Sequence, residues 1–427
     1  MRVPAPFLRA GLALALLLPT LAHGPAEARS RTPPGNLASR LRSVEAPDSQ
    51  GEQPPAFSLD GQLVNQLSYE RMRQGNHFTD LAYGRTAVSA RLQGPVGLSL
   101  STTLRLEPGP TSPAGLVPSH TGYAETLILR WTQDPWRVFA GKINPRFGAA
   151  WSRAPGVFGA DYAADYQLRE KLGAGARIWM DQVLDLPDPL GNQSLQFEVF
   201  QADTSFLSAS AFAPRWTLAT TEADPLTGTE TTSIRQRWRA SRLMGGADNR
   251  RGLGGTTVSW VGTEVEVPGG KVAYNAGLSV RRAGLDAQLA GRAGTEVGSV
   301  AGIEGAFPLP AGMLLVPAVE YARRTGADGY QGRNADWWTA ALTLKRGAIS
   351  VAYAWMQRRE TDAPVGASGA ERAMGRQHTV NATLDLGRAT GLEVLRFAAI
   401  SVDWRHRNEL GERVQGFGTS FVVSLPF

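Results

Sequence analysis

An alternation of apolar with polar or small residues runs through most of this chain and restricts the folds open to it. Leu63, Leu67 and Tyr69 alternate with polar residues, and segments 96–107 and 349–356 repeat the pattern. A period of two is typical of β-strands that have one apolar face and one polar face. The sequence therefore predicts an all-β protein.

Long apolar runs, by contrast, do not occur after residue 28. The longest, Ala311–Val319, is interrupted by Pro317 and falls far short of the roughly 20 residues that a membrane-spanning helix needs. The mean hydropathy of −0.20 is that of a soluble protein. An average over alternating strands hides one fully apolar face, so this value does not exclude a barrel in a membrane.

The N-terminal 28 residues have the pattern of an export signal. Arg2 and Arg9 lie on the N-terminal side of a short apolar core. Ala26-Glu27-Ala28 is a small-x-small cleavage pattern. We expect cleavage near Ala28, an uncleaved anchor being the alternative. Residues 29–55 are rich in Pro, Ser, Arg and Gln without periodicity, and we interpret them as a flexible periplasmic leader. The chain has no cysteine, which excludes disulfides, cysteine-ligated zinc and a cysteine nucleophile.

The last strand indicates where the protein works. Its alternate residues are apolar and the chain ends on phenylalanine: Phe417, Phe421, Val423, Leu425 and Phe427. This ending resembles the assembly signal of bacterial outer-membrane barrels, in which Phe421, Val423, Leu425 and Phe427 would be read by the barrel-assembly machinery. The resemblance implies an outer-membrane location, with membrane lipid and lipopolysaccharide as neighbours. A secreted soluble β-sandwich is the alternative.

Residues 56–427 then form one transmembrane antiparallel β-barrel with short periplasmic turns and long extracellular loops. At about 23 residues per strand with its share of turn and loop, we predict 16 strands, with 18 as the alternative. Segments 204–255 and 285–291 fit either strand or loop. Aromatic residues near predicted strand ends suit two interfacial girdles: Tyr69, Tyr123, Trp131, Trp136, Tyr321, Trp338, Trp355 and Trp404.

A barrel of this size encloses water, so the inward-facing charges are expected to carry the function. The net charge is +6, and only four of the 44 basic residues are lysines, which leaves 40 arginines scattered singly. The alternation places a set of arginines on predicted inward faces, together with Glu320 among the acids, and we predict that these arginines line the pore: Arg85, Arg91, Arg105, Arg130, Arg235, Arg237, Arg239 and Arg281. Fixed guanidinium groups favour anions. The alternatives are a neutral lattice of Arg–acid pairs, or rim arginines that bind lipopolysaccharide phosphates.

A second resemblance comes from Gly141-Lys142-Ile143-Asn144-Pro145-Arg146-Phe147-Gly148. This Gly-Lys-x-x-x-Pro-x-Phe-Gly pattern at a strand end resembles a motif of the phosphate-selective porin superfamily. The resemblance implies that the loop near 145–171 folds into the lumen, where its charged residues would form a constriction: Arg146, Arg153, Asp161, Asp165 and Arg169. A homotrimer is an expectation taken from the resemblance of the predicted barrel to sixteen-stranded porins. That family clusters lysines in its pore and this chain has four lysines in all, so the resemblance stops short of phosphate selectivity. The alternative is that the glycines and Pro145 only end a strand.

Enzyme motifs are absent from the sequence, which lacks HExxH, GxSxG and GxxxxGK[ST]. We therefore expect no enzyme, no cofactor, no metal and no nucleic-acid partner. The sequence predicts an outer-membrane porin for passive diffusion of small hydrophilic solutes, with a mild anion preference. A structural or surface-interaction barrel and a substrate-specific uptake channel are the alternatives.

Overall fold

The computed structural model describes residues 57–108, 120–156, 158–223, 230–362, 371–409 and 411–427. The predicted signal peptide (1–28) and leader (29–55) lie outside the described residues. Among the residues described, no helix is long and apolar enough to cross a membrane.

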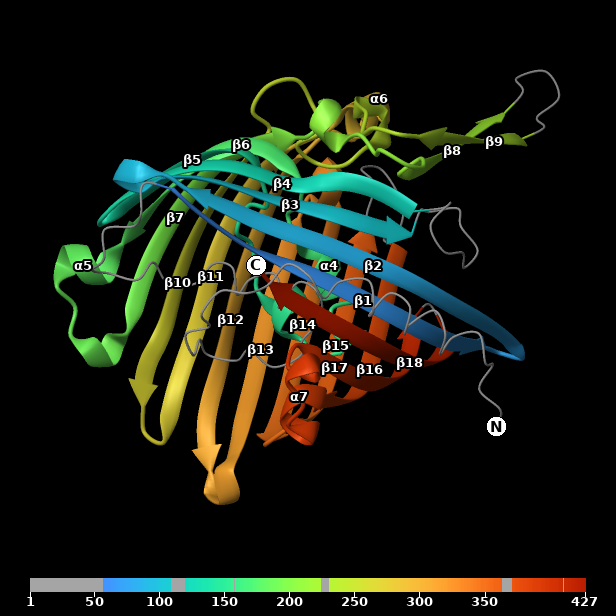
Figure 1. Cartoon of the computed structure of the whole chain (residues 1–427). Helices are drawn as coiled ribbons and strands as arrows, with labels where there is room; N and C mark the ends of the chain where they lie inside the picture. The colour runs from blue at the N-terminus through green and yellow to red at the C-terminus, as the bar shows by residue number, and fades with distance from the viewer. Residues whose placement is uncertain (1–56, 109–119, 157, 224–229, 363–370, 410) are drawn as a thin grey trace.

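Sixteen antiparallel strands close into one barrel, as predicted (Figure 1). Every neighbouring pair in the wall is antiparallel. Along the chain, each strand of the wall is followed directly by its neighbour, except that β8 and β9 lie between β7 and β10. The strands of the wall are β1 Ser58–Gln74, β2 His77–Gln93, β3 Leu98–Pro108, β4 His120–Gln133, β5 Trp136–Ile143, β6 Lys171–Trp179, β7 Asn192–Ala202, β10 Gly255–Val267, β11 Gly270–Arg282, β12 Thr295–Leu309, β13 Met313–Thr325, β14 Arg333–Arg346, β15 Ile349–Asp362, β16 Glu371–Asp385, β17 Ala398–Glu409 and β18 Glu412–Pro426.

The segment between β7 and β10 answers the question that the sequence left open. Strands β8 (Trp216–Ala223) and β9 (Glu230–Arg237) pair only with each other, as a two-stranded sheet outside the wall. They stand apart from the barrel at its loop-bearing end (Figure 1). The strand count is therefore sixteen and not eighteen. The other ambiguous stretch, 285–291, contains the short helix α6 (Leu285–Leu289).

The remaining helices are single turns. The α-helices are α3 Ala150–Arg153, α4 Ala163–Tyr166, α5 Met180–Leu184 and α7 Leu386–Thr390. The 3-10 turns are η2 Pro95–Gly97, η3 Asp188–Leu190, η4 Phe206–Ser208, η5 Arg242–Met244, η6 Pro310–Gly312, η7 Ala327–Gly329 and η8 Glu393–Leu395. Helices this short are not stable alone, so contacts with the barrel hold them.

The two faces of the wall reverse the arrangement of a soluble protein. Large apolar side chains are exposed on the outside, such as Leu278 at 60% and Ile303 at 53%. The inside carries buried polar groups, such as Gln377, Asn381 and Thr383. This is the pattern of a barrel surrounded by lipid and filled with polar groups, and it explains how a low mean hydropathy is compatible with a membrane.

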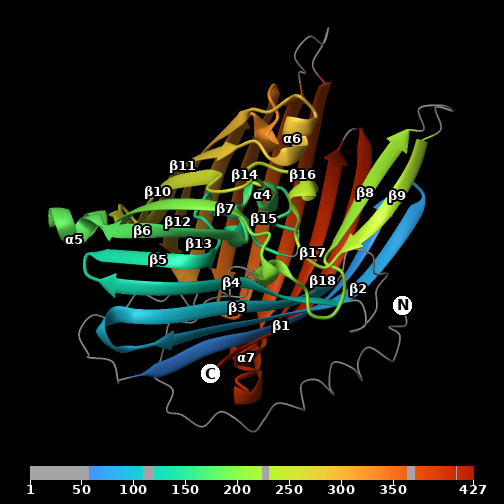
Figure 2. The same cartoon turned by 90° about the horizontal axis from the view of Figure 1, so that it is seen from above.

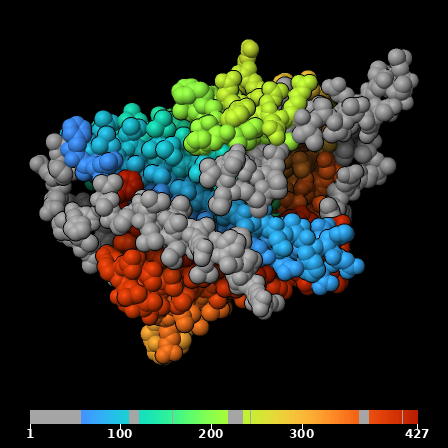
Figure 3. All heavy atoms as spheres, turned by 45° about the vertical axis from the view of Figure 1, so that its right-hand side comes forward, coloured from blue at the N-terminus to red at the C-terminus, as the bar shows by residue number. Residues whose placement is uncertain are grey.

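The barrel closes where the chain ends meet. Strand β18 pairs with β1 from Gln62 opposite Pro426 onward. Beyond that register, Gly61 N donates to Phe427 O at 2.8 Å and Phe427 N donates to Gly61 O at 3.0 Å. The C-terminal strands, in orange and red, and the N-terminal strands, in blue, lie together on one face (Figure 3). No strand edge is left open in the wall.

Candidate functional site: a lumenal segment and its charged contacts

The segment that joins β5 to β6, residues 144–170, lies inside the barrel, where its helix α4 is seen within the ring of strands (Figure 2). Its contacts are with the opposite wall. Inward-facing side chains of β13, β15, β16 and β17 bond to it: Glu320, Arg324, Arg358, Gln377 and Arg405. The segment therefore crosses from β5 to strands far away in the sequence.

The motif glycines allow this path. Gly141 has φ +136, and a Cβ there would lie 2.1 Å from the carbonyl oxygen of Leu127 on β4. Gly148 has φ +76, and its Cβ would lie 2.7 Å from the ring of Tyr166 and 2.9 Å from Glu320 Oε1. A side chain at position 141 would require the backbone of β4 to shift, and one at position 148 would adopt a strained φ and displace the Tyr166 ring and the Glu320 carboxylate. The glycines thus serve the docking of the segment and not only the end of a strand.

Glu320 on β13 is the main anchor of the segment. Its carboxylate accepts hydrogen bonds from Ala149 N (2.7 Å), Ala150 N (2.9 Å), the Tyr166 hydroxyl (2.6 Å) and Asn275 Nδ2 (3.0 Å). Burial, together with the nearby Glu320 carboxylate, raises the pKa of Tyr166 well above its usual value. The hydroxyl therefore remains a donor at any physiological pH.

Apolar packing adds to this anchor. Phe147, the motif aromatic, packs edge-on against Tyr166, and Tyr166 contacts Trp337 of β14 with ring centroids 5.5 Å apart. Phe147 and Tyr166 are each at most 1% exposed. Aromatic rings of this size contribute most of the burial energy of such a small cluster.

Charged contacts hold the far end of the segment. Asp161 accepts from Arg405 Nη1 at 2.7 Å, and Gln377 Nε2 donates to Asp161 Oδ2 at 3.0 Å. Asp165 pairs with Arg358 at 3.2 Å. Burial raises the pKa of Asp165, and the positive charge of Arg358 offsets part of that rise.

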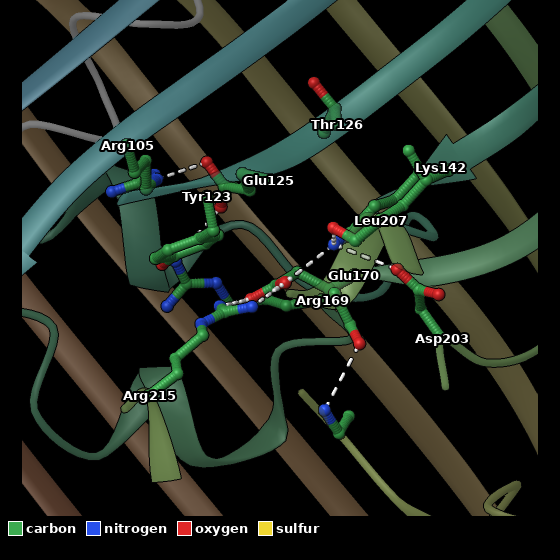
Figure 4. Close-up of polar contacts among 12 residues, drawn as sticks. Arg105, Tyr123, Glu125, Thr126, Lys142, Arg169, Glu170, Asp203, Leu207 and Arg215 are labelled. Atoms are coloured by element: carbon green, nitrogen blue, oxygen red, sulfur yellow. Dashed lines mark hydrogen bonds and ion pairs between the residues drawn. The ribbon is translucent and has the colours of Figure 1, made fainter. Parts of the chain in front are cut away.

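A second group of charges, here called the foot cluster, lies where the segment leaves and rejoins the wall (Figure 4). It consists of alternating cations and anions: Arg105, Glu107, Glu125, Lys142, Arg169, Glu170, Asp203 and Arg215. Glu125 bridges Arg105 of the wall and Arg169 of the segment, the latter at 3.0 Å. A register shift at Thr103/Leu104 accompanies the burial of Glu125.

Lys142, the motif lysine, has no exposed surface and belongs to the same cluster. Its Nζ lies 3.0 Å from both Glu170 Oε2 and Asp203 Oδ2 and donates to the Leu207 carbonyl at 2.9 Å. Arg215 then donates to Glu170 at 2.6 Å and stacks on Tyr123. The cluster therefore connects the lumenal segment to the extracellular segment 203–215.

Tyr123 was predicted to belong to an interfacial aromatic girdle, and its position differs from that prediction. It is 8% exposed and points into the foot cluster, where its hydroxyl donates to Glu107 Oε2 at 3.2 Å. Trp131, Trp136, Trp338 and Trp404 are exposed on the outside at 41% to 53%, as a girdle residue should be.

The eight arginines predicted to line the pore separate into three groups. Arg85, Arg91 and Arg130 lie on inward faces of β2 and β4 and are half-buried. Arg85 stacks on Tyr83, and Arg130 donates to Ser101 Oγ. These three are positioned to act on solutes in the lumen.

Two more of the predicted pore-lining arginines also face inward, but they are buried in ion pairs. Arg105 belongs to the foot cluster, and Arg281 pairs with Glu296 on β12 and lies 3.6 Å from Asp248. Their charge is balanced locally. Arg235, Arg237 and Arg239 were predicted to line the pore if their stretch is extended; Arg235 and Arg237 lie on β9, but β9 belongs to the separate hairpin and Arg239 follows it, so none of the three is on a strand of the wall.

The residues predicted at the constriction all belong to the lumenal segment. Arg153 pairs with Glu304 at 3.0 Å, and Asp161, Asp165 and Arg169 make the contacts given above. The backbone N of Arg146 donates to Glu198 Oε2 at 2.8 Å.

The sequence predictions missed two arginines. Arg137 on β5 and Arg177 on β6 are directly opposite each other and half-buried on the inward face. Arg137 bonds to Thr132 at 3.0 Å, and Arg177 bonds to Gln196 at 2.7 Å. The alternation of Trp136, Val138 and Ala140 with Arg137 indicates an inward-facing Arg137, but β5 is too short for this alternation to be recognised in the sequence.

Among the described residues there is no group of three or more His, Cys, Asp or Glu side chains that could hold a metal ion.

This architecture, with an apolar outside, a polar inside and a closed antiparallel wall, is that of a porin-like outer-membrane β-barrel. Among solved structures, the chain is similar to OmpF of Salmonella typhi in complex with daunomycin, at a TM-score of 0.52 and 11% identity over 86% of this chain and 97% of that one. It also matches OpdQ of Pseudomonas aeruginosa (TM-score 0.44, 9% identity, 87% of this chain and 98% of that one) and a trimer form of OmpT of Vibrio cholerae (0.46, 10%, 87% and 100%). No protein-family model and no curated protein matches the chain.

Proposed function

We propose that the protein is an outer-membrane porin, a water-filled channel for passive diffusion of small hydrophilic solutes. A sixteen-stranded barrel is wide enough to enclose water. The likeness to OmpF supports the fold. The proposal gives the protein no catalytic role, and includes association into a homotrimer, as the resemblance to porins implies. Native mass measurement of the folded protein in detergent tests the trimer.

The proposed channel runs between the lumenal segment and the inner wall of β1–β6. Segment 144–170 occupies the wall of β13–β17 through Glu320, Arg358 and Arg405. Space for solute is then left on the side of β1–β6. There the segment would form the narrowest part of the channel.

The charge of that inner wall carries the anion preference. Apart from the foot cluster and Lys171, which pairs with Asp248, the inward-facing charged residues of β1–β6 are five arginines and two acids: Arg85, Arg91, Arg130, Arg137, Arg177, Asp60 and Glu70. Half-buried guanidinium groups along a water-filled passage raise the local concentration of anions. Their planar forks suit carboxylates and phosphate esters.

Planar-bilayer recording tests the proposal. A pore gives ohmic single-channel steps, and a salt gradient gives a reversal potential of the sign for anions. Steps with a cation-selective reversal potential would retain the channel and remove the anion preference. A folded protein that gives no steps would contradict the channel itself.

One observation favours a second candidate, a surface-interaction role. The β8–β9 hairpin extends away from the wall, and Trp238, which follows it, is 50% exposed (Figure 1). A protein that is electrically silent in bilayers, and that loses binding to a surface partner when residues 216–237 are deleted, would support this role over the channel.

A further inference from the structure

The segment between β7 and β10 carries an unbalanced positive charge. The barrel begins and ends on the periplasmic side, and β7 is the seventh strand of the wall, so this segment is extracellular. Its residues 235–251 contain one acid, Asp248, which has no exposed surface and pairs with Lys171 at 2.9 Å. The same residues contain six arginines that this acid does not balance: Arg235, Arg237, Arg239, Arg242, Arg250 and Arg251.

Two of these arginines, Arg235 and Arg237, lie on strand β9. Residues two apart in a strand point to the same face and are about 6.8 Å apart, so the two side chains form a short row on one face of the β8–β9 sheet. Arg235 is exposed and Arg237 is half-buried. Within the described part of the chain neither forms an ion pair, so the charge of the row is uncompensated.

Strand β9 also has a free edge. Its eight residues pair with β8, and the two strands form a sheet of their own that stands apart from the wall (Figure 1). Among the described residues, no third strand pairs with β9. Half of the backbone N–H and C=O groups of an edge strand point away from its partner, and another extended chain can bond to them there.

The base of the hairpin is fixed to the barrel. Arg215 N donates to Arg237 O at 2.8 Å, and Ser210 N donates to Trp238 O at 2.9 Å. The side chain of Arg215 reaches the foot cluster, where it donates to Glu170 at 2.6 Å. A binding edge that is already ordered loses less conformational entropy when a chain binds to it. The barrel therefore presents the edge and the arginine row of β9 in a defined position.

The arginine row determines which chain fits this edge. Opposite residues of two paired strands have Cβ atoms about 4.5–5.5 Å apart, and opposite charges at such positions stabilise the pair. Alternate residues of an added strand share the face of Arg235 and Arg237, so the complementary chain has Asp or Glu at every second position. Strand β8 contains one charged residue, Glu222, and no basic one. An acidic strand is therefore directed to the edge of β9.

The same charges argue against a second copy of the hairpin as the occupant. The acid of β9, Glu230, is separated from Arg235 by an odd number of positions, so the two belong to opposite faces of the strand. A second β9 would therefore bring arginines and no carboxylate to the arginine face. Like charges at opposite positions destabilise a strand pair.

We propose that the free edge of β9 binds an extended acidic segment of another extracellular protein as a third strand, with carboxylates at alternate positions beside Arg235 and Arg237. Backbone hydrogen bonds supply the affinity of such strand addition, and the side chains supply its specificity. This inference gives the surface role of the hairpin a binding mode and a partner class. It rests on the extracellular position of the hairpin and not on conduction, because the hairpin lies outside the wall.

The test is a calorimetric titration of the folded full-length mature protein in detergent with a peptide that alternates glutamate with threonine. The peptide has eight residues, the length of β9, and blocked ends. The double variant Arg235→Gln, Arg237→Gln is expected to bind it roughly 10-fold more weakly than the parent, because two cross-strand charge pairs are lost. The same peptide N-methylated at every amide keeps its charge but has no backbone donors, and we expect it to lose binding to the parent.

Matched variants separate strand addition from simple charge attraction. Arg250→Gln, Arg251→Gln removes the same charge from the same segment outside β9 and is expected to change the affinity by at most about twofold, because salt screens distant charges. Arg235→Glu, Arg237→Glu is expected to lose the acidic peptide and to bind a peptide that alternates lysine with threonine.

Circular dichroism shows that each variant folds. Equal affinity of the parent and the Arg235→Gln, Arg237→Gln variant would overturn the proposal, as would equal affinity of the parent for the plain and N-methylated peptides. Conductance is measured separately on the same preparations. A parent that binds the peptide as expected but gives no channel steps would remove the proposed channel and support strand addition.

Discussion

Removing the Glu320 carboxylate tests whether its contacts hold segment 144–170 in the lumen. In Glu320→Ala, three donors of the segment lose their acceptor, Ala149 N, Ala150 N and the Tyr166 hydroxyl; Asn275 Nδ2, which also loses it, belongs to β11 of the wall and does not hold the segment. A hydrogen bond to a charged group contributes about 1.5–3 kcal/mol, and water replaces part of this. Because such contacts are not additive, we take about 4 kcal/mol as the net loss of docking free energy. The ratio of docked to undocked segment then falls roughly 1,000-fold.

Two graded variants accompany this change. Tyr166→Phe removes one of the three bonds between the segment and Glu320 while its ring keeps its contacts with Phe147 and Trp337, so we expect a loss of about 1.5–3 kcal/mol. Glu304→Ala removes the half-exposed pair with Arg153, for which we expect at most about 1 kcal/mol.

Single-channel conductance and limited proteolysis read out the result. We expect Glu320→Ala to have larger, noisier steps and a new cleavage site within 144–170, Tyr166→Phe a smaller change, and Glu304→Ala the parent's behaviour. Circular dichroism confirms an intact barrel. A folded Glu320→Ala variant with the conductance and protease pattern of the parent would refute both the anchoring role of Glu320 and the constriction.

Four further predictions follow from the site and the barrel closure. Deleting residues 154–164 should raise single-channel conductance, and an unchanged step size would remove the constriction from the proposal. Replacing Arg85, Arg91 and Arg130 by Gln should move the reversal potential toward cations, whereas the double variant Arg105→Gln, Glu125→Gln, which keeps the foot cluster neutral, should lower the melting temperature and leave selectivity alone. Lys142→Met leaves Asp203 without its buried cation, while Glu170 keeps Arg215, and should cost about 3–5 kcal/mol, measured as unfolding in denaturant. Deleting Phe427 removes two hydrogen bonds of the closure to Gly61 and should reduce the yield of assembled barrel in outer-membrane fractions, with a Phe427→Tyr control close to the parent.

The sequence by itself determined the class of fold. Alternation depends only on the period of the strand, and lipid outside with water inside makes that period visible in the longer strands of the wall. It therefore predicted a sixteen-stranded barrel and the inward faces of Arg85, Arg91 and Arg130. It also placed Glu320 inward, since a residue between Val319 and Tyr321 has to face the lumen.

Tertiary structure decided what those side chains meet. Nothing in the local sequence of Glu320 indicates that Tyr166 is its partner, because their contact spans more than 150 residues and depends on the path of a loop. The ion pair of Arg105 is equally invisible in the sequence. Alternation places Arg105 and Arg85 on inward faces alike, although Glu125 neutralises the charge of Arg105. Alternation left the stretch around Arg235 and Arg237 open between strand and loop, and the structure shows a strand that pairs with β8 alone. Periodicity fixes the face of a strand, whereas ion pairing and sheet membership depend on neighbours that only the closed barrel brings together.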